Sequence, residues 1–268
     1  MFFDGKKILV TGGTGFIGRN LVDGLVRENA VILVLDRQVK DRIDNVKYIE
    51  ADISDKGALG KIVKEFDPEY IIHLAANNSH DEDDETREDI RTANVIGTRN
   101  LLETTKEINY QRFVFLSSGE VYFGNNAPFR EDMDTKDASS YSKSKIESEG
   151  DCNEYVRFGK KIVILRPSIV YGPGQKPGMF IPSMIDAAMD GRKFEMTPGE
   201  QTRDFVYVLD LVDAIIKACK EEKAAGQVIN IGSGFAIRLL DAANMVKKII
   251  PDFNFEAGAI EYRKNEIF

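Results

Sequence analysis

The chain has 268 residues, of which 43% are hydrophobic and 30% are charged, and its formal net charge at pH 7 is −8. This composition is typical of a globular protein, and the length suits one large domain or two small ones. The acidic balance argues against nucleic acid or an anionic membrane as the main partner.

The lack of a recognisable targeting signal and the small number of cysteines favour a cytoplasmic protein. The sequence has no apolar run near the roughly 20 residues that a membrane span needs. The first residues lead directly into the first expected strand and leave no room for a signal peptide. Cys152 and Cys219 are the only cysteines, so we expect no disulfide framework and a reducing compartment.

Short apolar runs alternate with helical patterns over the first part of the chain. Apolar runs predict strands at 8–10, 31–35, 46–49, 70–74, 112–116 and 161–165. Helical spacing predicts helices around 21–26 and at 56–66, 90–108 and 139–158. Strands and helices in alternation predict an α/β fold, a Rossmann-type doubly wound parallel sheet.

Beyond residue 166 prolines and glycines interrupt regular structure as far as residue 182. Further elements are expected at 181–190 (helix), 204–208 (strand), 211–222 (helix), 228–231 (strand) and 239–249 (helix). We interpret the later part as a smaller C-terminal lobe at the carboxyl edge of the main sheet, where this architecture binds its ligands. The expected domains are therefore 1–167, rejoined by about 204–232, and a smaller lobe of 168–203 and 233–268.

A glycine-rich turn, Gly12-Gly-Thr-Gly-Phe-Ile-Gly18, joins the first strand to the first helix. Glycines allow close approach to a pyrophosphate, and the helix N-terminus attracts its charge, so the order predicts dinucleotide binding. The spacing fits G-x-G-x-x-G from Gly13 and also G-x-x-G-x-x-G from Gly12. Asp36 ends the second strand, where a carboxylate would bond the adenosine ribose. NAD is the expected cofactor and NADP is less favoured, although Arg37 could reach a 2′-phosphate.

Tyr141 and Lys145 are four residues apart in an expected helix and so share one face. Taken alone, such a pair fits an ordinary exposed helix face. Ser117 and Ser118, however, end the strand at 112–116, at the same carboxyl edge of the sheet. A nearby ammonium should lower the pKa of a tyrosine, normally about 10, so that Tyr141 could take a proton from a substrate hydroxyl bonded to Ser118.

An acidic run, Asp81-Glu-Asp-Asp-Glu85, follows His80. These residue types could bind a metal ion, but a solvated acidic loop is the more common role of such a run. We expect no metal site and a loop that points away from an anionic substrate.

Motifs in a fixed order along nearly the whole chain carry a family resemblance. They are Gly12 to Gly18, Asp52-Ile53, His73-Leu-Ala-Ala76, Asn94-Val-Ile-Gly-Thr98, Ser117-Ser-Gly-Glu-Val-Tyr122, Tyr141 with Lys145, Arg166-Pro167, Val170-Tyr-Gly-Pro-Gly174, Arg203-Asp-Phe-Val-Tyr-Val208 and Asn230-Ile-Gly-Ser-Gly234. In order and spacing the chain resembles the extended short-chain dehydrogenase/reductases, in the NAD-dependent sugar-nucleotide epimerase/dehydratase branch.

The resemblance implies roles for particular residues. Catalytic roles are implied for Ser118, Tyr141, Lys145 and Glu120. Substrate contacts are implied for Ser118, Glu120, Tyr141 and Arg203, of which Arg203 would hold the diphosphate. Cofactor contacts are implied for Gly12, Gly15, Phe16, Ile17, Gly18, Asp36, Arg37, Asp52, Ile53, Leu74, Ala75, Ala76, Asn94, Ser117, Tyr141, Lys145, Pro167 and Ser168.

The resemblance also implies an NAD-binding Rossmann domain, a substrate-binding lobe, a nucleoside-diphosphate sugar as partner and a homodimer that pairs helices 94–107 and 139–157. Compared with typical members of that family, the chain looks truncated at its C-terminus. Phe123 also stands where the family usually has glycine.

The leading functional hypothesis is an NAD-dependent nucleoside-diphosphate-sugar epimerase, similar to UDP-glucose 4-epimerase, that transfers hydride at a ring carbon, most simply C4. A nucleotide-sugar 4-keto reductase would use the same side chains. A 4,6-dehydratase is disfavoured, because resembling dehydratases have two acids after the serine or threonine and this chain has Gly119 before Glu120. A non-catalytic dinucleotide sensor or scaffold would not need the pair of Tyr141 and Lys145.

Overall fold

The computed structural model describes residues 1–262, and the chain forms two compact units. The first unit comprises Met1–Pro167 and Leu209–Ile231; the second comprises Ser168–Val208 and the residues from Gly232 onward. The chain returns to the first unit at Leu209, later than the expected position near residue 204. Strand β9 (Thr202–Tyr207) pairs with β7 (Ile169–Tyr171) and β11 (Ala236–Arg238) instead of joining the main sheet.

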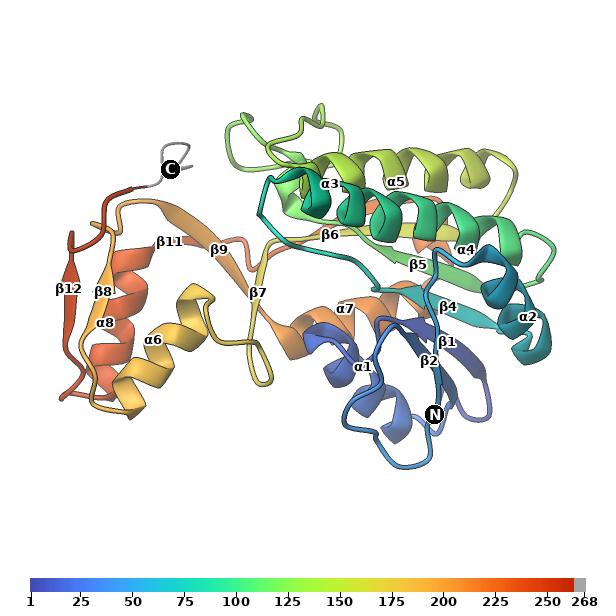
Figure 1. The fold of residues 1–268 in the computed structure, drawn as a ribbon, viewed down its shortest axis with the longest axis horizontal. Coiled ribbons are helices and arrows are strands. Elements are labelled where there is room, and N and C mark those ends of the chain that lie inside the picture. Colours follow the sequence, from blue (N-terminus) through green and yellow to red (C-terminus); the bar gives the residue numbers. More distant parts are fainter. Residues whose placement is uncertain (263–268) are drawn as a thin grey trace. The chain divides into compact units, whose positions relative to one another are not determined.

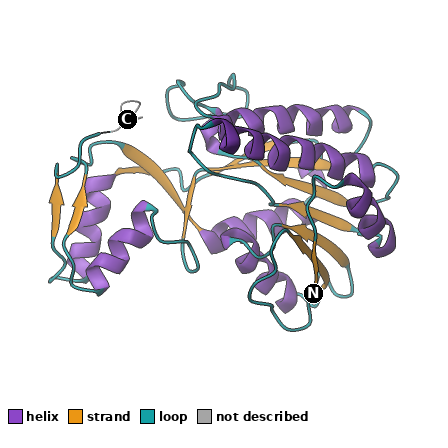
Figure 2. Ribbon diagram, viewed as in Figure 1, coloured by secondary structure: helices purple, strands orange, loops and turns teal. Residues whose placement is uncertain are grey.

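A parallel sheet in the order β10-β6-β5-β4-β1-β2-β3 is the centre of the first unit (Figures 1 and 2). This confirms the doubly wound fold. In chain order its strands are β1 (Lys7–Thr11), β2 (Val31–Asp36), β3 (Lys47–Glu50), β4 (Tyr70–His73), β5 (Arg112–Leu116), β6 (Ile162–Pro167) and β10 (Val228–Ile231). Strands β1, β4 and β5 are continuous apolar runs because both faces of the sheet are covered by helices.

Helices α1 (Phe16–Arg27) and α7 (Val208–Lys220) cover one face of this sheet, and α2 (Lys56–Phe66), α4 (Gly97–Thr105) and α5 (Ser140–Arg157) cover the other (Figure 1). Short 3₁₀ turns follow β5 (η2, Gly119–Val121) and α7 (η3, Glu222–Ala224). Leu9, Leu33, Leu101 and Phe113 belong to the buried cluster between the sheet and α2, α4 and α5. Burial of this apolar area supplies most of the stabilisation that holds the sheet edge in place.

The helix expected at 90–108 begins earlier than the sequence pattern indicates. Helix α3 (Asp84–Ile90) runs into a π-helical turn, η1 (Arg91–Ile96), and then into α4. Asp83 caps α3, since its carboxylate accepts hydrogen bonds from the Thr86 N–H and hydroxyl, and Asp84 and Glu85 lie in the first turn, where the helix dipole favours acids. The interpretation of the acidic run as a solvated loop is therefore wrong for its second half.

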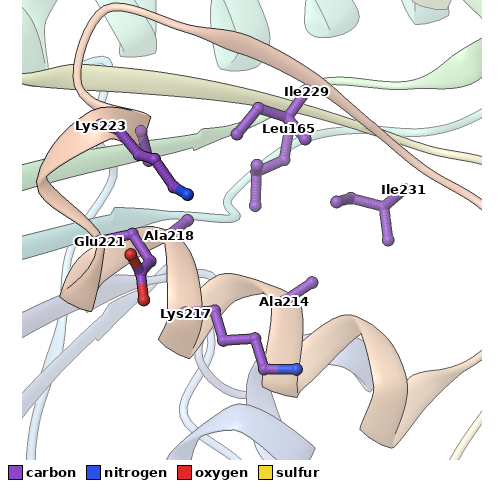
Figure 3. A pocket seen from close by; sticks show the side chains of 9 residues that line it. Leu165, Ala214, Lys217, Ala218, Glu221, Lys223, Ile229 and Ile231 are labelled. Atoms are coloured by element: carbon purple, nitrogen blue, oxygen red, sulfur yellow. The ribbon is translucent and has the colours of Figure 1, made fainter.

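A hollow of about 290 Å³ lies in the first unit between α7 and strands β6 and β10 (Figure 3). Most of its lining is aliphatic: Leu165, Ala214, Ala218, Ile229 and Ile231. None of the candidate site residues lines it, so this hollow is separate from the expected active site.

The second unit has its own core. Strands β7, β9 and β11 form a small sheet, and β8 (Phe194–Met196) pairs in parallel with β12 (Phe255–Ala257). Helices α6 (Phe180–Met189) and α8 (Leu239–Ile249) pack their apolar faces together with Met184, Met196, Ala243 and Phe253 in the buried cluster. Strands of three residues carry too little periodicity to be predicted, which explains why β7, β8, β11 and β12 were not expected. Among the helices described, none combines the length and the apolar character needed to cross a bilayer.

Candidate active site

The glycine turn connects β1 to α1 at the carboxyl end of the sheet. Gly12 has φ +72°, and a Cβ there would lie 2.6 Å from the Ala75 amide nitrogen, so only glycine fits. A Cβ on Gly18 would collide with the carbonyl oxygen of Gly12. Gly15 is the N-cap of α1, and no side chain within residues 1–262 caps this helix terminus. The backbone N–H groups of the first turn of α1 are thus available to an anion.

Asp36 lies beside this turn at the end of β2. Its Oδ2 atom accepts hydrogen bonds from the Thr14 N–H at 3.1 Å and the Thr14 hydroxyl at 2.6 Å, and its Oδ1 atom accepts one from the Arg37 N–H at 2.8 Å. The Arg37 guanidinium pairs with Asp89 at 3.3 Å. The carboxylate is therefore fixed in orientation, and the nearby arginine already has an acidic partner.

Residues after β4 are tied to β1 and α4 through His73. The imidazole bonds Thr11 through Nδ1 at 2.6 Å and Thr98 through Nε2 at 2.9 Å, and burial lowers the pKa of His73 to about 3. A neutral, fully bonded histidine is a structural residue. The Thr11 hydroxyl also accepts a hydrogen bond from the Ala75 N–H, which places Leu74 to Ala76 next to the glycine turn.

Asn94 lies in the π-helical turn η1, a feature that is common at functional sites. Its buried side chain accepts a hydrogen bond from the Asn77 N–H at 2.7 Å and donates to the Asn77 carbonyl and to Ser144 of α5. The bonds join α5 to the segment after β4. Asn94 is thus a bridge at the active-site end of α5, consistent with its position in the family motif.

Ser118, Tyr141 and Lys145 converge at the carboxyl end of β5. Lys145 is 4% exposed; its Nζ atom donates to the Leu116 carbonyl at 2.8 Å and lies 5.8 Å from the centre of the Tyr141 ring. Ser118 lies close enough to Tyr141 to act on the pKa of its phenol. Ser139 caps α5 in a capping box with Ser142, so the helix start and the tyrosine in its first turn are well defined.

The pKa values differ from the sequence-based expectation. Burial, reinforced by the Glu120 carboxylate, raises the pKa of Tyr141, although the Ser118 hydrogen bond opposes that rise. Burial lowers the pKa of Lys145 to about 8. The expectation that Lys145 brings the tyrosine nearer to neutral pH is wrong here, because desolvation outweighs the attraction of the ammonium. In this state Tyr141 is a proton donor.

Behind the converging side chains lies a buried ion pair. Glu149 of α5 and Arg166 of β6 form two hydrogen bonds, at 2.9 and 2.6 Å, and both side chains are 6% exposed. The Ser117 hydroxyl donates to Glu149 at 2.5 Å, and Arg166 donates to the Tyr122 hydroxyl at 2.6 Å. Since the Ser117 side chain is occupied inside the protein, any cofactor contact of Ser117 would use its backbone.

The remaining candidates lie at other strand ends. Asp52 and Ile53 follow β3; Asp52 accepts a hydrogen bond from the Ser54 N–H, and Ile53 is buried. Pro167 ends β6 and the first segment of the first unit. Ser168 begins the second unit, which also contains Arg203 on β9. The first unit alone thus brings together the glycine turn, Asp36, Asn94 and the Ser118–Tyr141–Lys145 group.

Residues 8–232 match the family described as NAD dependent epimerase/dehydratase family. The chain belongs to this family. It is 30% identical to a dTDP-D-glucose 4,6-dehydratase of Bos taurus over 94% of this chain and 75% of the relative. It is 33% identical to a putative UDP-glucose 4-epimerase of Methanocaldococcus jannaschii over 97% of this chain and 88% of the relative.

Among solved structures, the fold is similar to UDP-glucuronic acid 4-epimerase from Bacillus cereus, in complex with UDP-glucuronic acid and NAD. The TM-score is 0.85 at 28% identity, over 94% of this chain and 85% of that chain. These comparisons confirm the suspected family, the Rossmann-type fold, the enzyme class and, at the level of the family, NAD as cofactor. They include both epimerases and dehydratases, so they establish the class of reaction and no single activity.

The glycine turn fits this cofactor for two reasons. A Cβ at Gly12 or Gly18 would collide with neighbouring backbone, and the uncapped N-terminus of α1 offers N–H groups to the pyrophosphate. Within residues 1–262 no three His, Cys, Asp or Glu side chains gather closely enough to hold a metal ion.

Sequence reasoning missed several residues that shape the site. Glu149 follows Lys145 by four residues and Tyr141 by eight, so its place on the same helix face was a usable signal. Arg166 was noted only as part of a motif. No local pattern indicated Glu82 or His80, whose positions depend on tertiary contacts.

Proposed function

We propose that the protein binds NAD and a nucleoside-diphosphate sugar, oxidises a ring hydroxyl by hydride transfer, and returns the hydride to the opposite face, most simply at C4. This is a nucleotide-sugar 4-epimerase. The observation that carries the proposal is the convergence of Ser118, Tyr141 and Lys145 at the carboxyl end of β5, in the unit that contains the glycine turn.

The chain's own residues would bind NAD along the sheet edge. The backbone from Gly12 to Gly18 and the N-terminus of α1 would hold the pyrophosphate, Asp36 the adenosine ribose, and Asp52 with Ile53 the adenine. Lys145 would bond the nicotinamide ribose. When bound, NAD supplies the acceptor and donor of the hydride.

Tyr141 would hold and move the proton of the reacting hydroxyl. Ser118 would bond the same oxygen and fix its distance from the phenol. In the absence of other charges burial keeps Tyr141 protonated, so the protein needs positive charge near the phenol before Tyr141 can act as a base. The charged form of Lys145 supplies part of it.

Relatives support a nucleotide sugar as substrate. One similar structure is described as bound to UDP-glucuronic acid, and named relatives act on dTDP-glucose or UDP-glucose. Arg203 is the candidate to pair with the substrate's diphosphate. Dehydration is a second candidate function, favoured by Glu120, whose exposed carboxylate lies near Tyr141 and raises its pKa.

The test is a product analysis. We would incubate the protein with NAD and a panel of UDP- and dTDP-linked sugars and resolve the products by mass spectrometry and NMR. Inversion at one ring carbon without a mass change supports the epimerase, loss of one water supports dehydration, and turnover that needs stoichiometric NADH indicates a reductase. A protein that binds NAD but converts none of the sugars would contradict all three.

Tyr141→Phe should lower turnover by roughly 10²–10⁴-fold, the usual contribution of general acid–base catalysis, and leave NAD binding nearly unchanged. Tyr155→Phe, on the same helix but packed against the hydrophobic core, is the matched control. Near-normal turnover of Tyr141→Phe would show that Tyr141 does not transfer the proton.

A further inference from the structure

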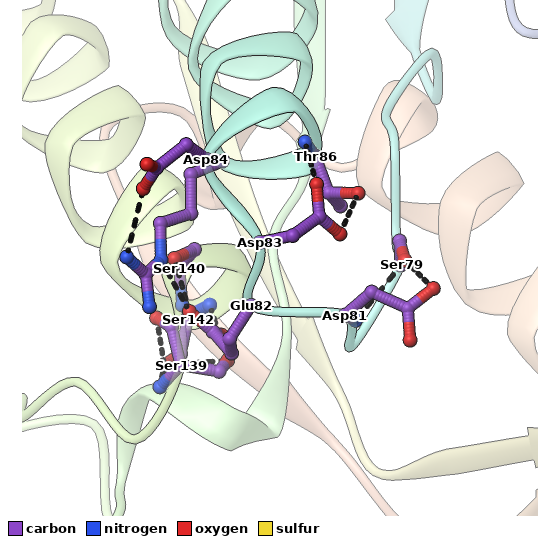
Figure 4. A network of polar contacts seen from close by, with 10 residues as sticks. Ser79, Asp81, Glu82, Asp83, Asp84, Thr86, Ser139, Ser140 and Ser142 are labelled. Carbon is purple, nitrogen blue, oxygen red and sulfur yellow. Dashed lines mark hydrogen bonds and ion pairs between the residues drawn. The ribbon is translucent and has the colours of Figure 1, made fainter.

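The segment Asn77–Asp83, the 77–83 loop, is held at both ends. At its start, Asn77 exchanges hydrogen bonds with Asn94 and donates to Asp89 at 2.6 Å. At its end, Glu82 accepts hydrogen bonds from the Ser140 N–H at 2.9 Å and from the Ser140 hydroxyl at 2.6 Å (Figure 4). Ser140 directly precedes Tyr141, so the loop is fixed to the helix turn that carries the tyrosine.

Bonds inside the loop restrict it further. The Ser79 N–H donates to the Asn77 side chain at 2.9 Å. The Asp81 N–H donates to the Ser79 hydroxyl at 3.2 Å (Figure 4). Arg87 of α3 also donates to Glu82. Glu82 thus clamps the loop on the start of α5.

Between the two anchors, His80 faces the candidate site. Its Nε2 atom lies 3.9 Å from Oε1 of Glu120, and its ring centre lies 6.1 Å from that of Tyr141 in an edge-to-face arrangement. The His80 side chain is 52% exposed and the Glu120 side chain 42% exposed. Both groups can thus reach a bound molecule and the solvent.

We propose that His80 is a further acid–base residue of this site: when Glu120, whose catalytic role the resemblance already implies, takes a proton from a carbon next to an oxidised ring carbon, His80 exchanges that proton with water. The pair gives the site a second acid–base group, which Gly119 cannot provide because it has no side chain. The inference rests on the proposed function for its substrate, a nucleoside-diphosphate keto sugar, and goes beyond it, since epimerisation at C4 needs no such pair.

The proton step balances without another reactant. The Glu120 carboxylate takes the proton of the C–H bond beside the ketone. The C–H electron pair becomes the C=C bond of the enolate, and the carbonyl π pair moves to oxygen, where Ser118 and Tyr141 would donate hydrogen bonds. Protonated Glu120 passes its proton to the neutral His80 imidazole, which releases it to water. The reverse path returns a solvent hydron to the carbon.

Deuterium wash-in tests the pair separately from hydride transfer. The protein, saturated with oxidised NAD, is given dTDP-4-keto-6-deoxyglucose or UDP-4-keto-6-deoxyglucose in D₂O, and NMR follows deuterium at the carbons next to the ketone. Oxidised NAD cannot reduce a ketone, so only proton transfer is observed. Exchange must exceed that of a protein-free sample, and an absence of exchange with both ketones overturns the proposal.

Variants identify the groups. Glu120→Gln should slow exchange by about 10²-fold or more, and His80→Ala by roughly 10- to 100-fold. Added imidazole should restore much of the His80→Ala rate, a result that a merely structural histidine would not give. Glu85→Gln, an exposed change in the first turn of α3, should exchange at the wild-type rate. Wild-type exchange in His80→Ala, or no effect of imidazole on it, overturns the proposal.

A second variant and an NMR measurement distinguish a lost proton relay from a misfolded protein. If His80→Ala does not fold, His80→Gln replaces it with the same expectation. Because the chain has two histidines, the His80 ring signals should move in Glu120→Gln while those of buried His73 stay in place. Epimerisation without exchange refutes this inference alone, and exchange without hydride transfer to any sugar refutes the proposed function alone.

Discussion

Disrupting the buried ion pair between Glu149 and Arg166 should strongly lower the free energy of unfolding. Glu149→Gln keeps the shape of the side chain and its bond with Ser117 but removes the charge that neutralises Arg166. Since both side chains are 6% exposed, the guanidinium would remain charged and without its partner in a region of low dielectric. Breaking a buried pair in this way costs about 3–5 kcal/mol.

Thermal and urea unfolding followed by far-UV circular dichroism measure this loss, as the chain has no tryptophan for fluorescence. A domain of this size loses about 2–4 °C of melting temperature per kcal/mol, so we expect a drop of roughly 6–20 °C. Glu154→Gln, an exposed change on the same helix, is the matched control and should shift the melting temperature by no more than about 2 °C.

The double variant Glu149→Gln with Arg166→Met separates the cause. If the cost comes from an uncompensated charge, removing the arginine charge as well should recover much of the stability, because a well-packed apolar replacement of a buried pair is often neutral. A loss below about 1 kcal/mol in Glu149→Gln, or a double variant that is less stable than the single one, would refute this reasoning.

Asp36 is oriented by Thr14, and Arg37 is paired with Asp89, so NAD should bind more tightly than NADP in calorimetric titrations; tighter binding of NADP would contradict the assignment. Gly18→Ala should destabilise the fold by about 1–3 kcal/mol and weaken NAD binding, since its Cβ would meet the carbonyl of Gly12; unchanged affinity in calorimetry would show that the turn is not the pyrophosphate site. We also predict a homodimer that pairs α4 and α5 across a two-fold axis, and a monomer mass in light scattering at micromolar concentration would contradict it.

The sequence predicted the central sheet well because its middle strands are buried on both faces. Such strands read as continuous apolar runs, and β1, β2, β4, β5 and β6 all lie where those runs occur. The position of Tyr141 and Lys145 on one helix face followed from their spacing alone. The start of α3 did not, because acidic residues in a helix's first turn have the same local composition as a solvated loop.

The position of His80 beside the candidate site could not be predicted from local sequence pattern. Its spacing from Tyr141 and Glu120 in the sequence has no periodic meaning. The bonds of Glu82 to Ser140 and of Asn77 to Asn94 hold the loop that carries His80 beside both side chains. The composition of this segment indicates only an acidic run next to a histidine. Its position is set by hydrogen bonds between elements far apart in the chain.

The direction of the pKa shift at Tyr141 likewise depends on tertiary contacts and not on spacing in the sequence. A four-residue spacing establishes that Lys145 is near, but the pKa also depends on how much water the fold removes and on which other charges it brings in. Here the fold buries the phenol and places Glu120 beside it, and both raise the pKa. Lys145 is itself desolvated, with a pKa of about 8, so much of its ammonium charge is lost above that pH. The four-residue spacing of Tyr141 and Lys145 therefore does not by itself bring the pKa of Tyr141 down toward neutral pH.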